Sequence, residues 1–146
     1  MSVIVVGVDG SEPSEAALRW ALEEARLRRA TLRVVHAWAV PALYVHGSAF
    51  PPELVDRDLI RERAEQLLGA AVTQVAGASP EVTIERVTAE GSPARVLVEA
   101  AHDADLLVVG SRGHGGFAGL LLGSVSQQCA HHADCAVVIV RTPHPS

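Results

Sequence analysis

The sequence has no lysine, since all 12 of its basic residues are arginine. A Walker A loop places a lysine on the β- and γ-phosphates of its nucleotide. Enzymes that form Schiff bases need a lysine amine, and acyl enzymes with a Ser-x-x-Lys motif need one too. The absence of lysine therefore excludes these three classes of protein in their usual forms.

Other features that the sequence lacks indicate where the protein is located and what it does not bind. Two cysteines are too few for a disulfide framework, and no apolar run reaches the roughly 18 residues of a membrane span. The first residues have neither the basic region nor the long apolar region of a signal peptide. A net charge of −5 gives no sign of the basic surface typical of nucleic-acid binders. We expect a cytoplasmic protein with no membrane or nucleic-acid partner.

Apolar residues are plentiful: 49% of the 146 residues are hydrophobic and 20% are charged. A chain of this size and composition builds one packed domain. Apolar runs rich in β-branched residues predict five strands, at residues 3–8, 31–38, 82–87, 105–109 and 136–140. Apolar residues at helical spacing predict four helices between them, at residues 12–29, 53–75, 93–104 and 123–133.

Strands and helices alternate along the chain, and this order predicts a parallel sheet with helices on both faces. We expect a three-layer, Rossmann-like α/β domain over residues 1–146, with an open five-stranded sheet in the order 3-2-1-4-5. In such sheets, ligands bind beyond the carboxyl ends of the strands, where the winding direction reverses. The expected order places that reversal between the first and fourth strands.

A carboxylate and a glycine-rich segment follow the two strands at that point. Asp9 follows the first strand, and residues 110–124 follow the fourth. Glycines let the backbone approach a ligand closely, and successive amides in such turns bind anions. Gly123 and Ser124 open a helix whose amino end adds free amides and a positive dipole. These features predict a phosphate site, while an ordinary surface turn and Asp9 as a helix cap are the alternatives.

The residues of this region resemble those of the universal stress proteins. The spacing Gly110-x2-Gly113-x9-Gly123-Ser124 is the nucleotide-binding pattern of that family, and residues 6–11, 34–37 and 132–141 are similar as well. The resemblance spans nearly the whole chain. One departure is Ala136, where many members of the family have proline before the last strand.

The resemblance implies an ATP-binding domain that dimerises and serves in stress adaptation, with Mg²⁺ left open as a companion of the phosphates. It implies that Asp9 holds the ribose and that the backbone at Ala37 meets the adenine. Val109 and Gly110 would line the pocket together with Gly7. The phosphates would be surrounded by Arg112, Gly113, Gly116, Gly123, Ser124, Val125 and Ser126.

Cysteine and histidine form a second pattern, at Cys129, His132 and Cys135. This spacing permits a metal site, but zinc sites bring paired ligands from two places, and here a fourth ligand is unassigned. We therefore predict ordinary buried thiols and assign no metal ligand and no catalytic residue. His36, at the end of a buried strand, is interpreted as a hydrogen-bonded core histidine.

The last strand, Val137–Val140, is an edge strand in the expected sheet. An exposed apolar edge tends to pair with another strand. We therefore expect a two-fold dimer with antiparallel pairing of these strands, and a monomer with a covered edge is the alternative.

Three functions are compatible with the sequence. The first is a regulatory module that binds an adenine nucleotide and acts as a nucleotide-dependent switch on an unidentified protein partner. The second is an enzyme that slowly hydrolyses the nucleotide or transfers its nucleotidyl group, and the third is a ligand-free scaffold dimer. No second carboxylate is obviously positioned for metal-assisted hydrolysis, so we predict the first function, with at most weak ATPase activity.

Overall fold

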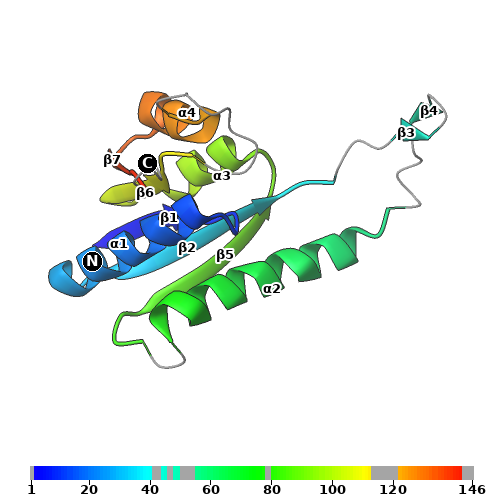
Figure 1. Ribbon diagram of the computed structural model, residues 1–146. Coiled ribbons are helices and arrows are strands. Elements are labelled where there is room, and N and C mark those ends of the chain that lie inside the picture. The colour runs from blue at the N-terminus through cyan, green and yellow to red at the C-terminus, as the bar shows by residue number, and fades with distance from the viewer. Residues whose placement is uncertain are drawn as a thin grey trace.

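A computed structural model describes residues 2–40, 44–45, 48–49, 55–77, 80–112 and 122–142. Its main feature is a five-stranded parallel sheet in the order β5-β2-β1-β6-β7, shown in Figure 1. The strands are β1 (Val3–Gly7), β2 (Thr31–Trp38), β5 (Ile84–Glu90), β6 (Leu106–Gly110) and β7 (Ala136–Val140). This arrangement confirms the order 3-2-1-4-5 predicted from the sequence. A separate pair of short antiparallel strands, β3 (Tyr44–Val45) and β4 (Ser48–Ala49), lies in the connection after β2.

Two helices cover each face of the sheet. α1 (Glu12–Arg28) and α2 (Arg57–Ala76) pack on one face, and α3 (Pro93–Ala100) and α4 (Ser124–His132) pack on the other. This division follows from the winding, because the chain moves outward from β1 through β2 to β5 and then returns to β6 and β7. The direction reverses between β1 and β6, which are hydrogen-bonded neighbours.

The sheet is apolar on both faces because helices cover both. Ile4, Val5 and Val6 of β1 are all fully buried, and their side chains alternate between the two cores. On β2 the alternation includes a charge, since Arg33 projects toward α3 and donates to the carbonyl oxygen of Ala100. Arg33 also pairs with Glu85 and Asp103, and its guanidinium lowers the pKa of the Asp103 carboxyl.

Local sequence signals set the start of α1, whereas the start of α2 differs from the prediction. Ser11 is the N-cap of α1, and its hydroxyl oxygen accepts from the Ser14 amide, 3.3 Å away. The sequence predicts that α2 begins at residue 53, and this prediction is wrong, because Asp56 is the N-cap of a helix that starts at Arg57. Leu59 has the helical spacing of a buried position in α2, but it is 41% exposed, because the buried residues of this helix begin five positions later, at Ala64.

Smaller shifts affect the predicted strands and the last helix. β5 starts at Ile84 instead of Val82 and continues to Glu90, while β6 and α4 start one residue later than predicted. Within the described residues, no helix combines the length and the apolar character that crossing a lipid bilayer requires.

Candidate functional site

The carboxyl ends of β1 and β6 lie side by side at one edge of the sheet. Val6 is paired in register with Val108, and each strand ends shortly after that pair. The last residue of β6 also lies close to the first turn of α1, because a Cβ atom at Gly110 would lie only 2.8 Å from the carbonyl oxygen of Pro13. Glycine at position 110 is therefore required by the close approach of α1.

Asp9 is held in a network of hydrogen bonds at the start of α1. The Ser11 amide donates to Asp9 Oδ1 at 2.9 Å, and the Ser11 hydroxyl donates to the same oxygen. The Ser14 hydroxyl accepts from the Asp9 amide at 3.2 Å and donates to the Ser11 carbonyl oxygen at 3.0 Å. The helix cap is thus Ser11, and Asp9 orients that cap while its half-buried side chain stays at the edge of the sheet.

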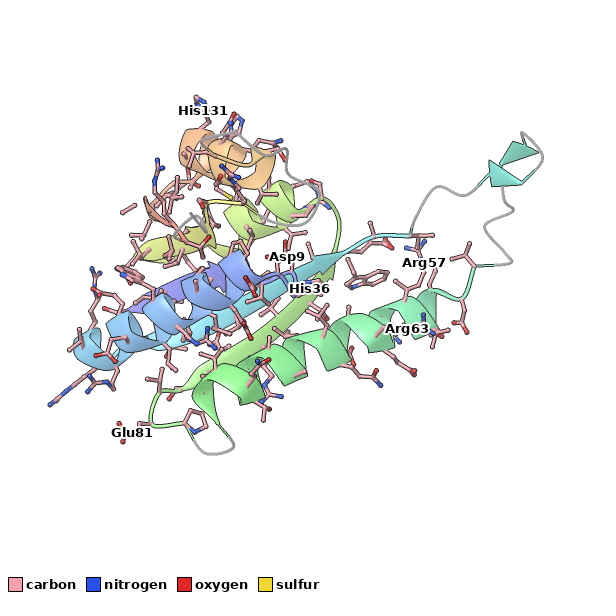
Figure 2. The ribbon with its side chains drawn as sticks, in the orientation of Figure 1. Asp9, His36, Arg57, Arg63, Glu81 and His131 are labelled. Atoms are coloured by element: carbon pink, nitrogen blue, oxygen red, sulfur yellow. The ribbon has the colours of Figure 1, made fainter. Side chains whose placement is uncertain are left out.

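Three of the predicted binding residues share one face of the sheet. A Cβ atom at Gly7 would lie 2.7 Å from Leu97 Cδ1, and Ala37 and Val109 belong to the core beneath α3 and α4. Strand alternation places His36 on the opposite face, where its Nδ1 lies 2.8 Å from the Val8 carbonyl oxygen. This contact confirms that His36 is hydrogen-bonded, and it requires the proton on Nδ1. The residue is only partly buried, so the prediction of a core position is wrong. Figure 2 shows Asp9 and His36 at the same end of the sheet.

The amino end of α4 lies at the same edge. Gly123 is its N-cap, and no side chain of the described residues caps this end. The first amides of a helix have no partner within the helix, and among the described residues no backbone carbonyl accepts from the amides of Ser124 and Val125. Amides in this position can bind an anion. The Gly123 amide itself donates to the Ser111 carbonyl oxygen at 2.6 Å, which joins the amino end of α4 to the end of β6.

Ser126 is turned into the protein. It is 1% exposed, and its hydroxyl lies 2.9 Å from the Gly123 carbonyl oxygen and 3.2 Å from that of Ser111. Ser124, two residues earlier, is exposed. The two serines for which the sequence predicts the same role therefore have opposite environments.

Most of the predicted site residues meet at this edge of the sheet. They follow or end three adjacent strands and begin α4: Gly7, Asp9, Ala37, Val109, Gly110, Arg112, Gly123, Ser124 and Val125. Gly113 and Gly116 lie outside the described residues. Two residues that support the site, Ser14 and Ser111, are not predicted from the sequence. A serine three residues after an N-cap was a usable signal for Ser14, whereas the role of Ser111 depends on contacts distant in sequence.

The cysteines behave as packed thiols. Cys129 is fully buried, and burial raises the pKa of its thiol to about 11. Cys135 is partly buried, which also raises the pKa of its thiol, and neither cysteine forms a disulfide. His132 is exposed, and among the described residues no cluster of histidine, cysteine or carboxylate side chains is arranged to hold a metal ion.

A separate hollow of about 320 Å³ lies between α3 and α4. It is lined by Ser92, Ala94, Arg95, Val98, Glu99, Gln128 and His132. None of these residues was predicted from the sequence to bind a ligand. Arg95 and Glu99 pair with each other across one turn of α3, so the charges of this wall are largely compensated.

Known proteins resemble this chain over nearly its whole length. The model of the universal stress protein family matches residues 1–141. Universal stress protein Rv2623 of Mycobacterium tuberculosis is 40% identical over 138 residues, which cover 94% of this chain and 44% of that protein. Universal stress protein Mb2028c of Mycobacterium bovis is 37% identical over 139 residues, with coverages of 94% and 45%. The chain spans about half the length of the curated relatives it matches.

Solved structures give the same result. A universal stress protein in complex with cAMP has a TM-score of 0.74 and 29% identity, and the match covers 97% of this chain and 98% of that one. The universal stress protein of Archaeoglobus fulgidus in complex with dAMP has a TM-score of 0.69 and 26% identity, with coverages of 95% and 97%. The fold and site define a doubly wound α/β domain with a carboxylate and a helix amino end at its switch point. The chain belongs to the universal stress protein family.

Proposed function

We propose that this chain is a regulatory module that binds an adenine nucleotide at the carboxyl edge of its sheet. The observation that carries the proposal is the placement of Asp9 and the amino end of α4 after the two central strands where the winding reverses. The complexes of two relatives with cAMP and dAMP support an adenylate as the ligand.

The residues present fit such a ligand without lysine. The Asp9 carboxylate is an acceptor for ribose hydroxyls, and the small side chain of Ala37 leaves nearby backbone for a flat base. Gly7 makes room for the packing of Leu97, so its place in the proposed site is beneath the ligand. The amides of Ser124 and Val125 would donate to phosphate oxygens, and the helix dipole favours their charge by about 0.3–1 kcal/mol. ATP is the proposed physiological ligand, with Arg112 adding positive charge, and a bound Mg²⁺ would neutralise part of the phosphate charge.

The proposed role is that of a nucleotide-dependent switch in stress adaptation. Occupation of the site would change how the chain binds a protein partner, whose identity is open. Weak ATPase activity at most, and a cytoplasmic location, stay predictions from the sequence.

A homodimer through β7 is part of the proposal. The two edges of the sheet differ, since β5 carries Glu85, Arg86 and Glu90, whereas β7 has no charged residue. Charged residues discourage pairing at an edge strand, and an uncharged apolar strand invites it. We therefore propose antiparallel pairing of two β7 strands about a two-fold axis.

Calorimetric titration with ATP tests the ligand. Asp9→Asn keeps the oxygen that accepts from the Ser11 amide but removes the negative charge, so we expect ATP affinity to fall by about tenfold or more, the equivalent of one strong hydrogen bond. Asp58→Asn is the matched control, because Asp58 lies on the exposed first turn of α2 and its loss should leave affinity unchanged. Absence of ATP binding by the unmodified chain would contradict the proposal.

A further inference from the structure

The environment of Ser126 identifies a group that supports the candidate site without lining it. A residue that is 1% exposed offers almost no surface for a phosphate oxygen to touch. A serine hydroxyl has one proton, and here that proton is shared between the carbonyl oxygens of Gly123 and Ser111. The hydroxyl is thus engaged inside the protein.

The two acceptors of Ser126 lie at a junction of three elements. The Ser111 carbonyl oxygen accepts from the Gly123 amide and from the Ser126 hydroxyl, both at the start of α4. The Ser111 amide donates to the Val140 carbonyl oxygen at 2.9 Å, at the end of β7. Ser111 itself directly follows β6 and is 6% exposed. The end of β6, the end of β7 and the first turn of α4 are therefore joined through one buried residue.

From this geometry we infer that Ser126 is a positioning residue for nucleotide binding and not a phosphate ligand. It holds the first turn of α4 against the ends of β6 and β7, so that the amides of Ser124 and Val125 face the ligand in a fixed direction. The inference rests on the proposed function, because it concerns the phosphate-binding end of the same site. Ser124 is exposed at the first position of α4, so a serine hydroxyl that contacts phosphate belongs there.

The test compares Ser126→Ala with Ser124→Ala in the full chain. Amide hydrogen exchange at Ser111 and Gly123 is measured first, without nucleotide. We expect Ser126→Ala to accelerate exchange at both amides by about 5-fold, the factor that corresponds to one ordinary hydrogen bond. Ser124→Ala should leave both rates unchanged, because Ser124 provides no side-chain cap to this helix.

Titration with ATP and with adenosine gives the second readout. Ser126→Ala should lower the affinity for ATP several-fold and leave the affinity for adenosine unchanged. The reason is that only the phosphates would contact the amino end of α4. Ser126→Cys keeps the size of the side chain with a weaker donor and should give intermediate values for exchange and for ATP, which guards against a variant that fails to fold.

Each outcome decides between the two roles. Unchanged exchange in Ser126→Ala with weaker ATP binding would make Ser126 a direct ligand and overturn the inference. Faster exchange with unchanged ATP affinity would leave a purely structural serine and overturn it as well. A failure of the unmodified chain to bind ATP would refute the proposed function instead, and that result is visible before any variant is made.

Discussion

At the scale of single residues, two glycines of this chain differ in whether their surroundings leave room for a side chain. Gly110 ends β6, and a Cβ atom there would lie 2.8 Å from the Pro13 carbonyl oxygen and 2.9 Å from its carbon. Backbone atoms cannot move aside as the end of a side chain can. Gly69 lies within α2, where a Cβ atom would have only Arg86 Nη1 near it, at 3.5 Å.

Alanine substitution should therefore have opposite signs at the two positions. Gly110→Ala should lower the free energy of unfolding by about 1–3 kcal/mol, because α1 must shift away from β6. Gly69→Ala should raise it by about 0.5–1 kcal/mol, because alanine is the better helix former. Urea unfolding of both variants measures the difference, and a stabilising Gly110→Ala would show that α1 and β6 are not in close contact.

At the scale of elements, β7 pairs with β6 on one side and, within the described residues, has no paired strand on the other. The Val140 carbonyl oxygen accepts from the Ser111 amide, so the backbone groups of Val140 and Val138 face β6. By alternation, the amide and carbonyl of Val137 and Ile139 face away from the sheet. These outward groups are the ones that a second β7 strand would bond.

Proline at position 137 should therefore separate dimerisation from folding. Val137→Pro removes an outward amide, a change that edge strands tolerate, and we expect it to convert the dimer to a monomer. Val137→Ala is the control, because it shortens the same side chain and keeps the amide. Sedimentation equilibrium measures the mass, and the β7 interface would be wrong if Val137→Pro still formed a dimer of unchanged affinity.

The sequence predicts elements well where one local signal decides them. The strand β7 is predicted with its observed limits, because an uninterrupted apolar run has no competing interpretation. The start of α2 is predicted too early, because Pro51, Pro52 and the charged residues after them give no clear helix cap before Asp56 is seen to bind the Leu59 amide. Helical spacing also predicts a buried Leu59, whereas burial depends on where α2 meets the sheet.

The candidate site shows the same division. The position of Asp9, and the start of the last helix to within one residue, are predicted from strand ends and glycine spacing, which are local. The difference between Ser124 and Ser126 is not predictable in this way, because it depends on contacts of Ser126 with Ser111, fifteen positions earlier. A family pattern identifies both serines without showing which one faces the ligand.

At the scale of the whole molecule, the absence of lysine simplifies how stability responds to alkali. Near pH 10, few side chains other than the two cysteines and the single tyrosine change charge. Burial raises the pKa of Cys129 from the ordinary value of 9.0 to about 11, so the folded state keeps a proton that the unfolded state has lost. The thiol therefore supports the fold fully below about pH 9, and that contribution is lost as pH rises through 11.

The free energy of unfolding should accordingly fall above pH 9, with a contribution from Cys129 of at most about 1.4 kcal/mol per pH unit. Cys129→Ala should flatten this part of the curve, although it lowers stability at neutral pH because it leaves a cavity. Cys135→Ala is the comparison, since that thiol is only partly buried. Urea titrations at several alkaline pH values measure the slopes, and equal slopes for Cys129→Ala and the unmodified chain would refute the assignment.

The pairing of β1 with β6 also has a consequence for any shortened form of this protein. Asp9 comes from the first tenth of the chain and Ser124 from the last quarter, and only the completed central sheet places them at one edge. An amino-terminal fragment that ends before Ser124, or a carboxyl-terminal fragment that begins after Asp9, lacks one half of the candidate site. Nucleotide binding would therefore report that the whole domain has assembled, and a nascent chain would gain this property only when its last strands are in place.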